Sequence, residues 1–199
     1  MKNVTLSLSL AIVCLSCSST KSTSKDNTSQ STTVAIDTSS EKVASPEPEK
    51  KIMRTMLVGK EDRKALEEAP FNTWYTTNYS NYSVNKTLIP DITNGLNGVT
   101  VTTFMGTWCG DSKRETPRMF KILDVANFDN SDLELITVDR TKQNPTEFTS
   151  GQNIKRVPTF IFKRDGKEIG RIVERPIESL EKDMIKILNG ETYKHAYEK

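Results

Sequence analysis

The chain has 199 residues, which is room for one ordinary domain plus tails, and 35% of its residues are hydrophobic. That share is low for a chain folded throughout, so we expect part of the sequence to lie outside any core. The formal charge is +2, from 28 Lys and Arg against 26 Asp and Glu, and without a basic stripe we exclude nucleic acid as a partner.

The first seventeen residues predict an export signal. Lys2 is followed by an apolar stretch over residues 4–13, which is too short for a transmembrane helix. Residues 14–17, Cys-Leu-Ser-Cys, resemble the lipobox of bacterial lipoproteins, in which a small residue precedes the cysteine that is lipidated. Ser16 before Cys17 fits that pattern better than the bulky Val13 before Cys14.

The resemblance implies a lipid anchor at Cys17 and a bacterial cell-envelope location, with the domain on the periplasmic or extracytoplasmic side of a membrane. The alternative is ordinary signal cleavage near Ser18 and a soluble secreted protein. In either case Cys14 and Cys17 belong to the export signal, so the folded domain carries only Cys109 and cannot form an internal disulfide.

Residues 18–50 predict a disordered tether. They are dominated by Ser and Thr, with charged residues and a final Pro-Glu-Pro-Glu-Lys run, and contain almost no bulky apolar groups. Such a segment cannot offset the entropy lost on ordering, and it would hold the domain away from the membrane.

Residues 51–97 predict a helical N-terminal extension. The pattern indicates one helix over Glu61–Ala69, ended by Pro70. A second helix follows, whose aromatic residues recur at spacings of three and four. These residues are Phe71, Trp74, Tyr75, Tyr79 and Tyr82. Packing of this face against the domain is the favoured interpretation, and a peptide-binding stripe is the alternative.

Residues 98–190 predict an α/β domain with a central mixed β-sheet flanked by helices. A helix over residues 110–127 carries Met119, Phe120, Leu123 and Ala126 on its inner side, and Asp165-Gly166 predicts a hairpin turn. The predicted strands are Val99–Met105, Leu133–Val138, Thr159–Lys163 and Glu168–Val173. The last helix carries Ile177, Leu180, Met184, Ile187 and Leu188 on one face and stops at Gly190, before a polar tail over residues 191–199.

Three segments of this domain resemble the thioredoxin family. Residues 104–112, Phe-Met-Gly-Thr-Trp-Cys-Gly-Asp-Ser, resemble its active-site segment, and Pro117 matches its helix-kinking proline. Residues 157–162, Val-Pro-Thr-Phe-Ile-Phe, resemble its cis-proline loop and following strand, and Asp165-Gly166-Lys167 matches the next turn. The likeness covers about residues 98–190 and implies a thioredoxin-like fold, with a cis bond before Pro158 that brings the loop at Val157 against Cys109.

The chemistry of such a site centres on Cys109 as a nucleophile. A thiol reacts as the thiolate, and the unpaired N–H groups at a helix N-terminus, such as those following Gly110, stabilise that anion. Trp108 would shield one side of the sulfur, and Pro117 would bend the helix without removing its first donors. Asp111 opposes the thiolate slightly, whereas Lys113 and Arg114 favour it.

Two departures from the family pattern define the expected activity. The second cysteine of the family is Ser112 here, and the buried aspartate of many members is Thr103. Cys109 would therefore form mixed disulfides that it cannot resolve internally. Release requires a thiol of the substrate, which gives isomerase-like exchange, or an external thiol reductant, which gives partner-dependent reduction. Ser112 either donates its hydroxyl to the thiolate or is a polar first-turn residue without a role.

The sequence thus predicts a monomeric, envelope-anchored enzyme that exchanges disulfides with protein or peptide thiols, without a cofactor or metal. The only histidine, His195, lies in the polar tail and is interpreted as inert. Arg140, Lys142, Arg171 and Arg175 are interpreted as a solvated charged face. The alternatives are a buried structural thiol at Cys109 and a non-catalytic module that binds partners or acts as a chaperone through the same groove.

Overall fold

The computed structural model describes residues 55–198. The predicted export signal over residues 1–17, with Cys17, and the predicted tether over residues 18–50 lie outside the described residues. No helix within the described range is long and apolar enough to cross a membrane.

A five-stranded mixed sheet forms the centre of the fold, in the order β1-β3-β2-β4-β5. The central strand β2 (Val99–Met105) runs parallel to β3 (Leu133–Thr137) and antiparallel to β4 (Thr159–Arg164). At the edges, β1 (Gly59–Glu61) pairs antiparallel with β3, and β5 (Lys167–Val173) pairs antiparallel with β4. The predicted mixed α/β sheet is confirmed.

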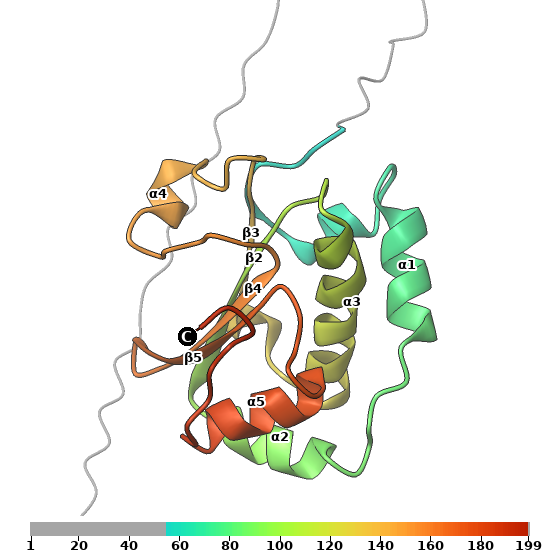
Figure 1. Cartoon of the computed structure of the whole chain (residues 1–199). Coiled ribbons are helices and arrows are strands. Elements are labelled where there is room, and N and C mark those ends of the chain that lie inside the picture. The colour runs from blue at the N-terminus through green and yellow to red at the C-terminus, as the bar shows by residue number, and fades with distance from the viewer. Residues whose placement is uncertain (1–54, 199) are drawn as a thin grey trace, which may run out of the picture. The chain divides into compact units, whose positions relative to one another are not determined.

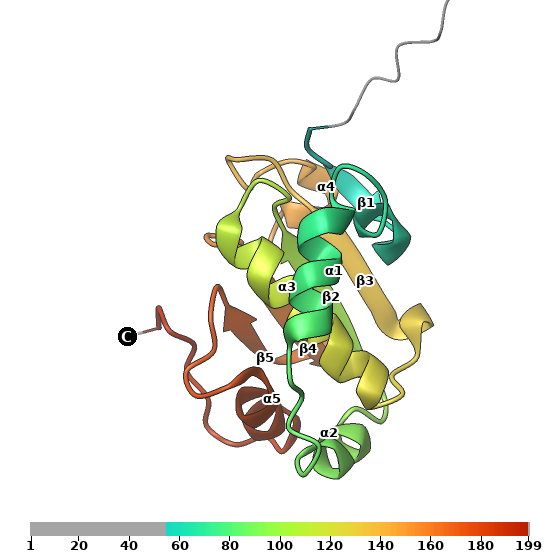
Figure 2. The same cartoon turned by 90° about the vertical axis from the view of Figure 1, so that its right-hand side faces the viewer.

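Most of the helices lie on one side of this sheet (Figure 1). They are α1 (Asn72–Asn81), α2 (Ile89–Gly95), α3 (Gly110–Val125) and α5 (Leu180–Leu188). The turned view shows α1 lying along α3 (Figure 2). The other side carries the short α4 (Thr146–Thr149) and its flanking loops. Two 3-10 turns, η1 (Arg63–Leu66) and η2 (Asn130–Asp132), complete the described elements.

Alternation along the strands divides the core into two clusters. Val101 and Met105 of β2 face the large cluster beneath α3, while Phe104 faces a smaller cluster on the α4 side. The predicted inner face of α3 is confirmed, because Met119, Phe120, Leu123 and Ala126 are all buried. The predicted hairpin turn is also confirmed, since Asp165 and Gly166 both adopt positive φ, of 51° and 73°.

The predicted helix over Glu61–Ala69 is wrong. Its first residue ends strand β1, and only residues 63–66 form a 3-10 turn, which the Asp62 side chain caps through the Lys64 N–H. A three-residue edge strand of Gly, Lys and Glu needs no alternation of apolar residues, since Lys60 points to solvent and pairs with Glu134. The hydrophobic pattern therefore carried no strand signal.

The segment predicted as an extension shares its core with the rest of the domain. Phe71 and Tyr75 of the aromatic face are buried in the large cluster, and Trp74, Tyr79 and Tyr82 are half-buried against it. The interpretation of this face as packing surface is confirmed. Residues 59–97 supply the edge strand β1 and helices α1 and α2 to the same compact unit as residues 98–190.

One residue of the predicted last helix is misplaced. Ile177 is 53% exposed and precedes α5, which begins at Leu180 after the N-cap Ser179. The backbone N–H of Ile177 instead donates to the buried Asp183 carboxylate, 2.6 Å away. This carboxylate also accepts from the Glu178 N–H, and thereby fixes the loop between β5 and α5.

A polar cluster joins the N-terminal segment to α3. The Arg63 guanidinium donates two hydrogen bonds of 2.7 Å to the Asp124 carboxylate, which also accepts from the Tyr79 hydroxyl. Burial by itself would raise the pKa of Asp124, but the hydrogen bonds from Arg63 and Tyr79 outweigh burial and hold that pKa below its ordinary value. Burial and the same hydrogen bond raise the pKa of Tyr79 to about 12.

We predict that Asp124→Asn lowers the free energy of unfolding at pH 7 by about 1–2 kcal/mol, because it weakens charge-assisted hydrogen bonds. A carboxyl whose folded pKa is depressed stabilises the fold above its unfolded value of about 4 and loses that contribution as the pH falls. Urea unfolding should therefore show a deficit at pH 7 that shrinks below about pH 4. The exposed Asp132→Asn is the control, and equal effects of both variants would contradict the prediction.

Candidate active site

Cys109 is the N-cap of α3, at the end of the sheet where β2 stops. Its backbone is extended, with φ −90° and ψ 129°, and its carbonyl accepts from the Lys113 N–H. The side chain is half-buried and packs beside the smaller apolar cluster. Cys109 is therefore neither sealed in the core nor fully exposed, as the predicted site requires.

The loop before β4 lies against this sulfur. The Val157–Pro158 bond is cis, and the Cys109 Sγ lies 3.3 Å from the carbonyl oxygen of Val157, to which the thiol donates. Val157 and Pro158 are both buried. Residues 48 positions apart in the chain thus meet at the sulfur, in the arrangement that the resemblance implied.

Trp108 is fixed beside the cysteine by three kinds of contact. Its indole N–H donates to the Val138 carbonyl at 2.9 Å. A Cβ atom on Gly106 would lie 2.5 Å from the indole ring, so only glycine allows the ring to take this position. The Arg140 guanidinium carbon and the Lys142 Nζ lie 5.3 and 5.9 Å from the ring centre.

Ser112 makes a hydrogen bond that neither sequence interpretation included. Its hydroxyl is fully buried and accepts from the Gly106 N–H at 3.2 Å. The side chain therefore ties the first turn of α3 to the loop beneath Trp108. No hydrogen bond joins Ser112 to Cys109 within the described residues.

Two threonines lie buried behind the site. Thr103 of β2 and Thr116 of α3 are fully buried, and their hydroxyls have no hydrogen-bond partner among the described residues. Thr103 stands where the resemblance would place an aspartate, so the buried environment at this position holds a neutral hydroxyl instead of a carboxyl group.

The charges on the first turns of α3 largely compensate one another. Arg114 pairs with Asp111 at 2.5 Å and with the buried Glu115 at 2.6 Å, and Glu115 also contacts Arg118. Asp111 is thus neutralised by Arg114 rather than aimed at the sulfur. Pro117 lies buried within α3, seven residues after the helix begins at Gly110. No group of residues between 55 and 198 has the composition of a metal site.

Sequence reasoning missed a contact between the tail and this site. The Tyr197 ring lies 3.9 Å from the Arg156 guanidinium carbon, and its hydroxyl donates to Glu174. Glu174 also pairs with Arg156, and its N–H donates to the Pro158 carbonyl at 2.7 Å. Residues 191–198 form no helix or strand, yet they support the loop that faces Cys109. The contacts of Tyr197 could not be predicted, because an isolated Tyr and an isolated Arg form no periodic pattern in the sequence.

The tail also borders a groove. A cavity of about 750 Å³ lies between β5 and the tail, and its lining includes Arg156, Arg171, Tyr193 and His195. Cys109 is not among its lining residues. The Tyr193 hydroxyl donates to the buried Asp183 at 2.8 Å, so the tail is also fixed to the start of α5.

We predict that Ser112→Ala lowers the free energy of unfolding by about 1–3 kcal/mol, because it leaves the buried Gly106 N–H without its acceptor. Urea unfolding followed by tryptophan fluorescence measures this loss. The exposed Ser131→Ala should change stability by less than about 0.5 kcal/mol. If Ser112→Ala lowers the free energy of unfolding no more than that control does, the hydrogen bond does not stabilise the fold.

Comparison with known proteins agrees with this geometry. A family model described as Thioredoxin matches residues 60–187. Thioredoxins H9 and H2 of Arabidopsis thaliana are 30% and 31% identical to the chain over 91 residues, which is 46% of this chain and 61% and 64% of those proteins. The alignments thus span less than two thirds of these relatives. A solved protein of unknown function from Pseudomonas aeruginosa superposes with a TM-score of 0.50 at 14% identity, over 66% of this chain and 93% of its own, and shows the fold alone. The chain belongs to the thioredoxin family, and its fold is thioredoxin-like.

Proposed function

We propose that the protein exchanges disulfides with protein or peptide thiols, with Cys109 as the nucleophile. The observation that carries the proposal is the position of its sulfur, at the first turn of α3 and 3.3 Å from the carbonyl before the cis-proline. The family relationship supports a thiol–disulfide function in general.

The reaction begins with the Cys109 thiolate. It attacks one sulfur of a disulfide, forms a Cys109–S–S–substrate bond, and releases the second sulfur as a thiolate that takes up a proton. The first-turn N–H groups of α3 favour the attacking anion. The edge of the loop at Val157 offers backbone hydrogen bonds to an extended peptide beside the sulfur.

Release of the mixed disulfide has to come from another molecule. Ser112 occupies the position from which a second thiol would attack, and it is engaged with the Gly106 N–H. Attack by the freed substrate thiol gives isomerase-like exchange without net oxidation. Attack by one thiol of an external dithiol on the Cys109 sulfur releases the reduced substrate, and the second thiol of that dithiol then frees Cys109, so that the substrate gains two electrons and the dithiol becomes a disulfide.

We predict that the wild-type chain accumulates a mixed disulfide with a model peptide disulfide, whereas Ser112→Cys does not, because its second thiol releases the peptide and closes an internal disulfide. Mass spectrometry under acid quenching distinguishes the two products. Cys109→Ser is the control and should form no adduct at this site, in a chain that carries Cys14→Ser and Cys17→Ser. A well-folded Ser112→Cys variant that still accumulates the adduct would contradict the role assigned to the missing thiol.

The absence of a second thiol in the site also leaves a binding function as the second candidate. A non-catalytic module would capture extended peptides at the same loop without covalent chemistry. Cys109→Ser separates the two, because it abolishes exchange but leaves simple peptide binding unchanged. Binding that persists, together with a wild-type chain that forms no adduct, would favour the module.

We further propose that the protein is anchored at Cys17 in a bacterial cell envelope, with the domain on the extracytoplasmic side. The proposal is supported by the Cys-Leu-Ser-Cys segment after a short apolar stretch and by the Ser- and Thr-rich residues that follow. Multiple acyl chains would make this anchor stable, since a single chain binds membranes only marginally.

In a bacterial host that lipidates exported proteins, we predict that the wild-type chain sediments with membranes and that Cys17→Ser moves to the soluble fraction. Cys14→Ser is the matched control and should stay with the membranes. Membrane association that survives Cys17→Ser would refute lipidation at that position, and a soluble wild-type protein would support the secreted alternative.

A further inference from the structure

The loop after β3 places two cations on the active-site tryptophan. Arg140 and Lys142 both lie over the Trp108 ring, next to the nucleophile of the proposed function. The sequence pattern suggested only a solvated charged face for these residues. Their position makes them part of the surface that a substrate of Cys109 would meet.

The loop is built to hold this position. The Asp139 carboxylate accepts from the Thr141 hydroxyl and the Asn144 side-chain amide, at 2.7 and 2.9 Å. The Lys142 N–H donates to the Asp139 carbonyl, and the Lys142 Nζ donates to the Arg140 carbonyl. Lys142 adopts a positive φ of 63°, which turns the chain back over the indole.

An aromatic ring orients a cation but leaves its charge in place. In the part of the chain that the structure describes, neither Arg140 nor Lys142 forms an ion pair or donates to a carboxylate. By contrast, Arg114 and Arg156, on the other sides of the site, are paired with Asp111 and Glu174. Asp139 is the one acidic residue in the turn, and its hydrogen bonds to Asn144 and Thr141 lower its pKa to about 2.

The charged groups beside Trp108 are therefore two cations and one carboxylate, and the carboxylate is hydrogen-bonded within the turn. Charges at such a rim raise the rate of encounter with an oppositely charged partner and disfavour a like-charged one. Since Trp108 and Cys109 are adjacent in the chain, the positive electric field of Arg140 and Lys142 acts on the surface next to the Cys109 sulfur.

We propose that Cys109 prefers disulfides whose cysteine is flanked by carboxylates, as in an acidic segment of a protein client, and that Arg140 and Lys142 select them. The inference rests on the proposed function. Carboxylates close to the attacked sulfur would lie near the two cations on Trp108, whereas lysines there would be repelled. A small anionic thiol that releases the mixed disulfide would be attracted by the same two cations, so the experiment has to distinguish it from an acidic protein client.

The test uses the full chain with Cys14→Ser and Cys17→Ser, so that Cys109 is the one thiol. The probes are three peptides of equal length whose single cysteine is a mixed disulfide with 2-thiopyridine and is flanked by Glu, Gln or Lys. Attack by Cys109 transfers the peptide to its sulfur and releases 2-thiopyridone, which absorbance follows. Dithiodiglycolate serves as a small anionic disulfide.

We expect Arg140→Gln with Lys142→Gln to lower the second-order rate constant for the Glu peptide about five-fold or more at low salt. The Gln peptide should change by less than two-fold, and the Lys peptide should react faster. Exchanging the two residues as Arg140→Lys with Lys142→Arg should retain the preference. The matched control is Lys86→Gln with Lys167→Gln, which changes the net charge equally.

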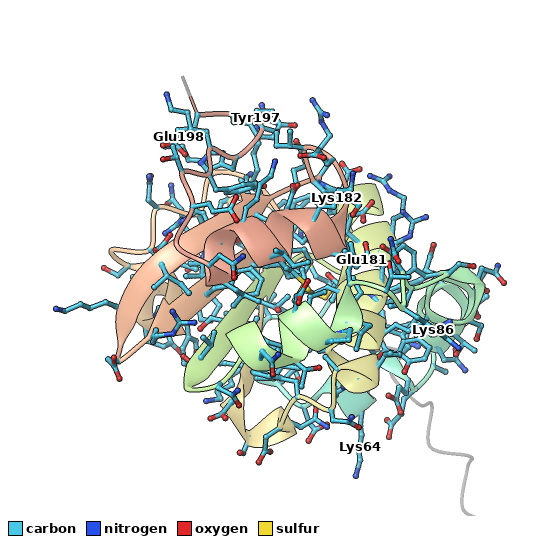
Figure 3. All side chains as sticks on the ribbon, turned by 90° about the horizontal axis from the view of Figure 1, so that it is seen from below. Lys64, Lys86, Glu181, Lys182, Tyr197 and Glu198 are labelled. Atoms are coloured by element: carbon cyan, nitrogen blue, oxygen red, sulfur yellow. The ribbon has the colours of Figure 1, made fainter. Side chains whose placement is uncertain are left out.

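The control lysines lie away from the site. Lys167 is exposed and lies opposite Arg164 in the β4–β5 ladder. Arg164 in turn lies opposite Val99, at the end of β2 that is far from Cys109. Lys86 is exposed in the segment before α2 and is seen in the view from below (Figure 3). The control variant should leave all peptide rates unchanged.

The outcomes separate the two levels of the argument. If the double substitution changes the rates of the Glu, Gln and Lys peptides by the same factor, the charge selection is overturned. The exchange function still stands in that case, because the peptides react. A loss confined to dithiodiglycolate would assign the cations to a small anionic thiol and overturn the acidic-client assignment. If no peptide reacts with the wild-type chain, the proposed function fails and takes this inference with it.

Discussion

The contact between the Cys109 sulfur and the Val157 carbonyl is the constraint on which the site depends. It requires that only the four residues 106–109 separate the end of β2 from the start of α3, and that the loop before β4 returns to the same end of the sheet. The antiparallel pairing of β2 with β4 supplies that return, because Phe104 lies opposite Thr159. Trp108, Gly106 and Ser112 then fix the short segment between strand and helix.

Elements whose residues alternate or repeat over many positions were predictable from the sequence. Strand β2 carries a β-branched and apolar run, α3 carries apolar residues at helical spacing, and the Asp165-Gly166 turn has a strong local preference. These signals came from long segments that bury one face. The family motifs added the meeting of Val157 with Cys109, which no periodicity within a single segment could predict.

The failures came from short polar segments held by tertiary contacts. Strand β1 is three residues long and is defined by its pairing with β3. Ile177 is apolar but exposed, because Asp183 binds the backbone before α5. Tyr197 and Glu174 reach the cis-proline loop from distant parts of the chain. Each of these features depends on a strand pairing or on single hydrogen bonds, and such contacts produce no periodic pattern of apolar residues.

The two sides of the sheet differ in a way that bears on the chemistry. One side is covered by four helices, whereas the other is covered by α4 and the loops around it. The loop between β3 and α4 therefore approaches Trp108 with Arg140 and Lys142. The family fold thus holds the cysteine, and the loop on the thinly covered side gives the surface around it a chemical character of its own.

The central proposal is that the Cys109 sulfur, at the start of α3, is the reactive nucleophile of the site. Its most direct test is the rate at which iodoacetamide alkylates Cys109 at pH 7, in the native chain and in the same chain unfolded in urea, with Cys14→Ser and Cys17→Ser in both. We expect several-fold faster alkylation of the native protein, because the positive end of α3 lies at this sulfur. A native rate equal to or below that of the unfolded chain would contradict it and would identify Cys109 as a structural thiol.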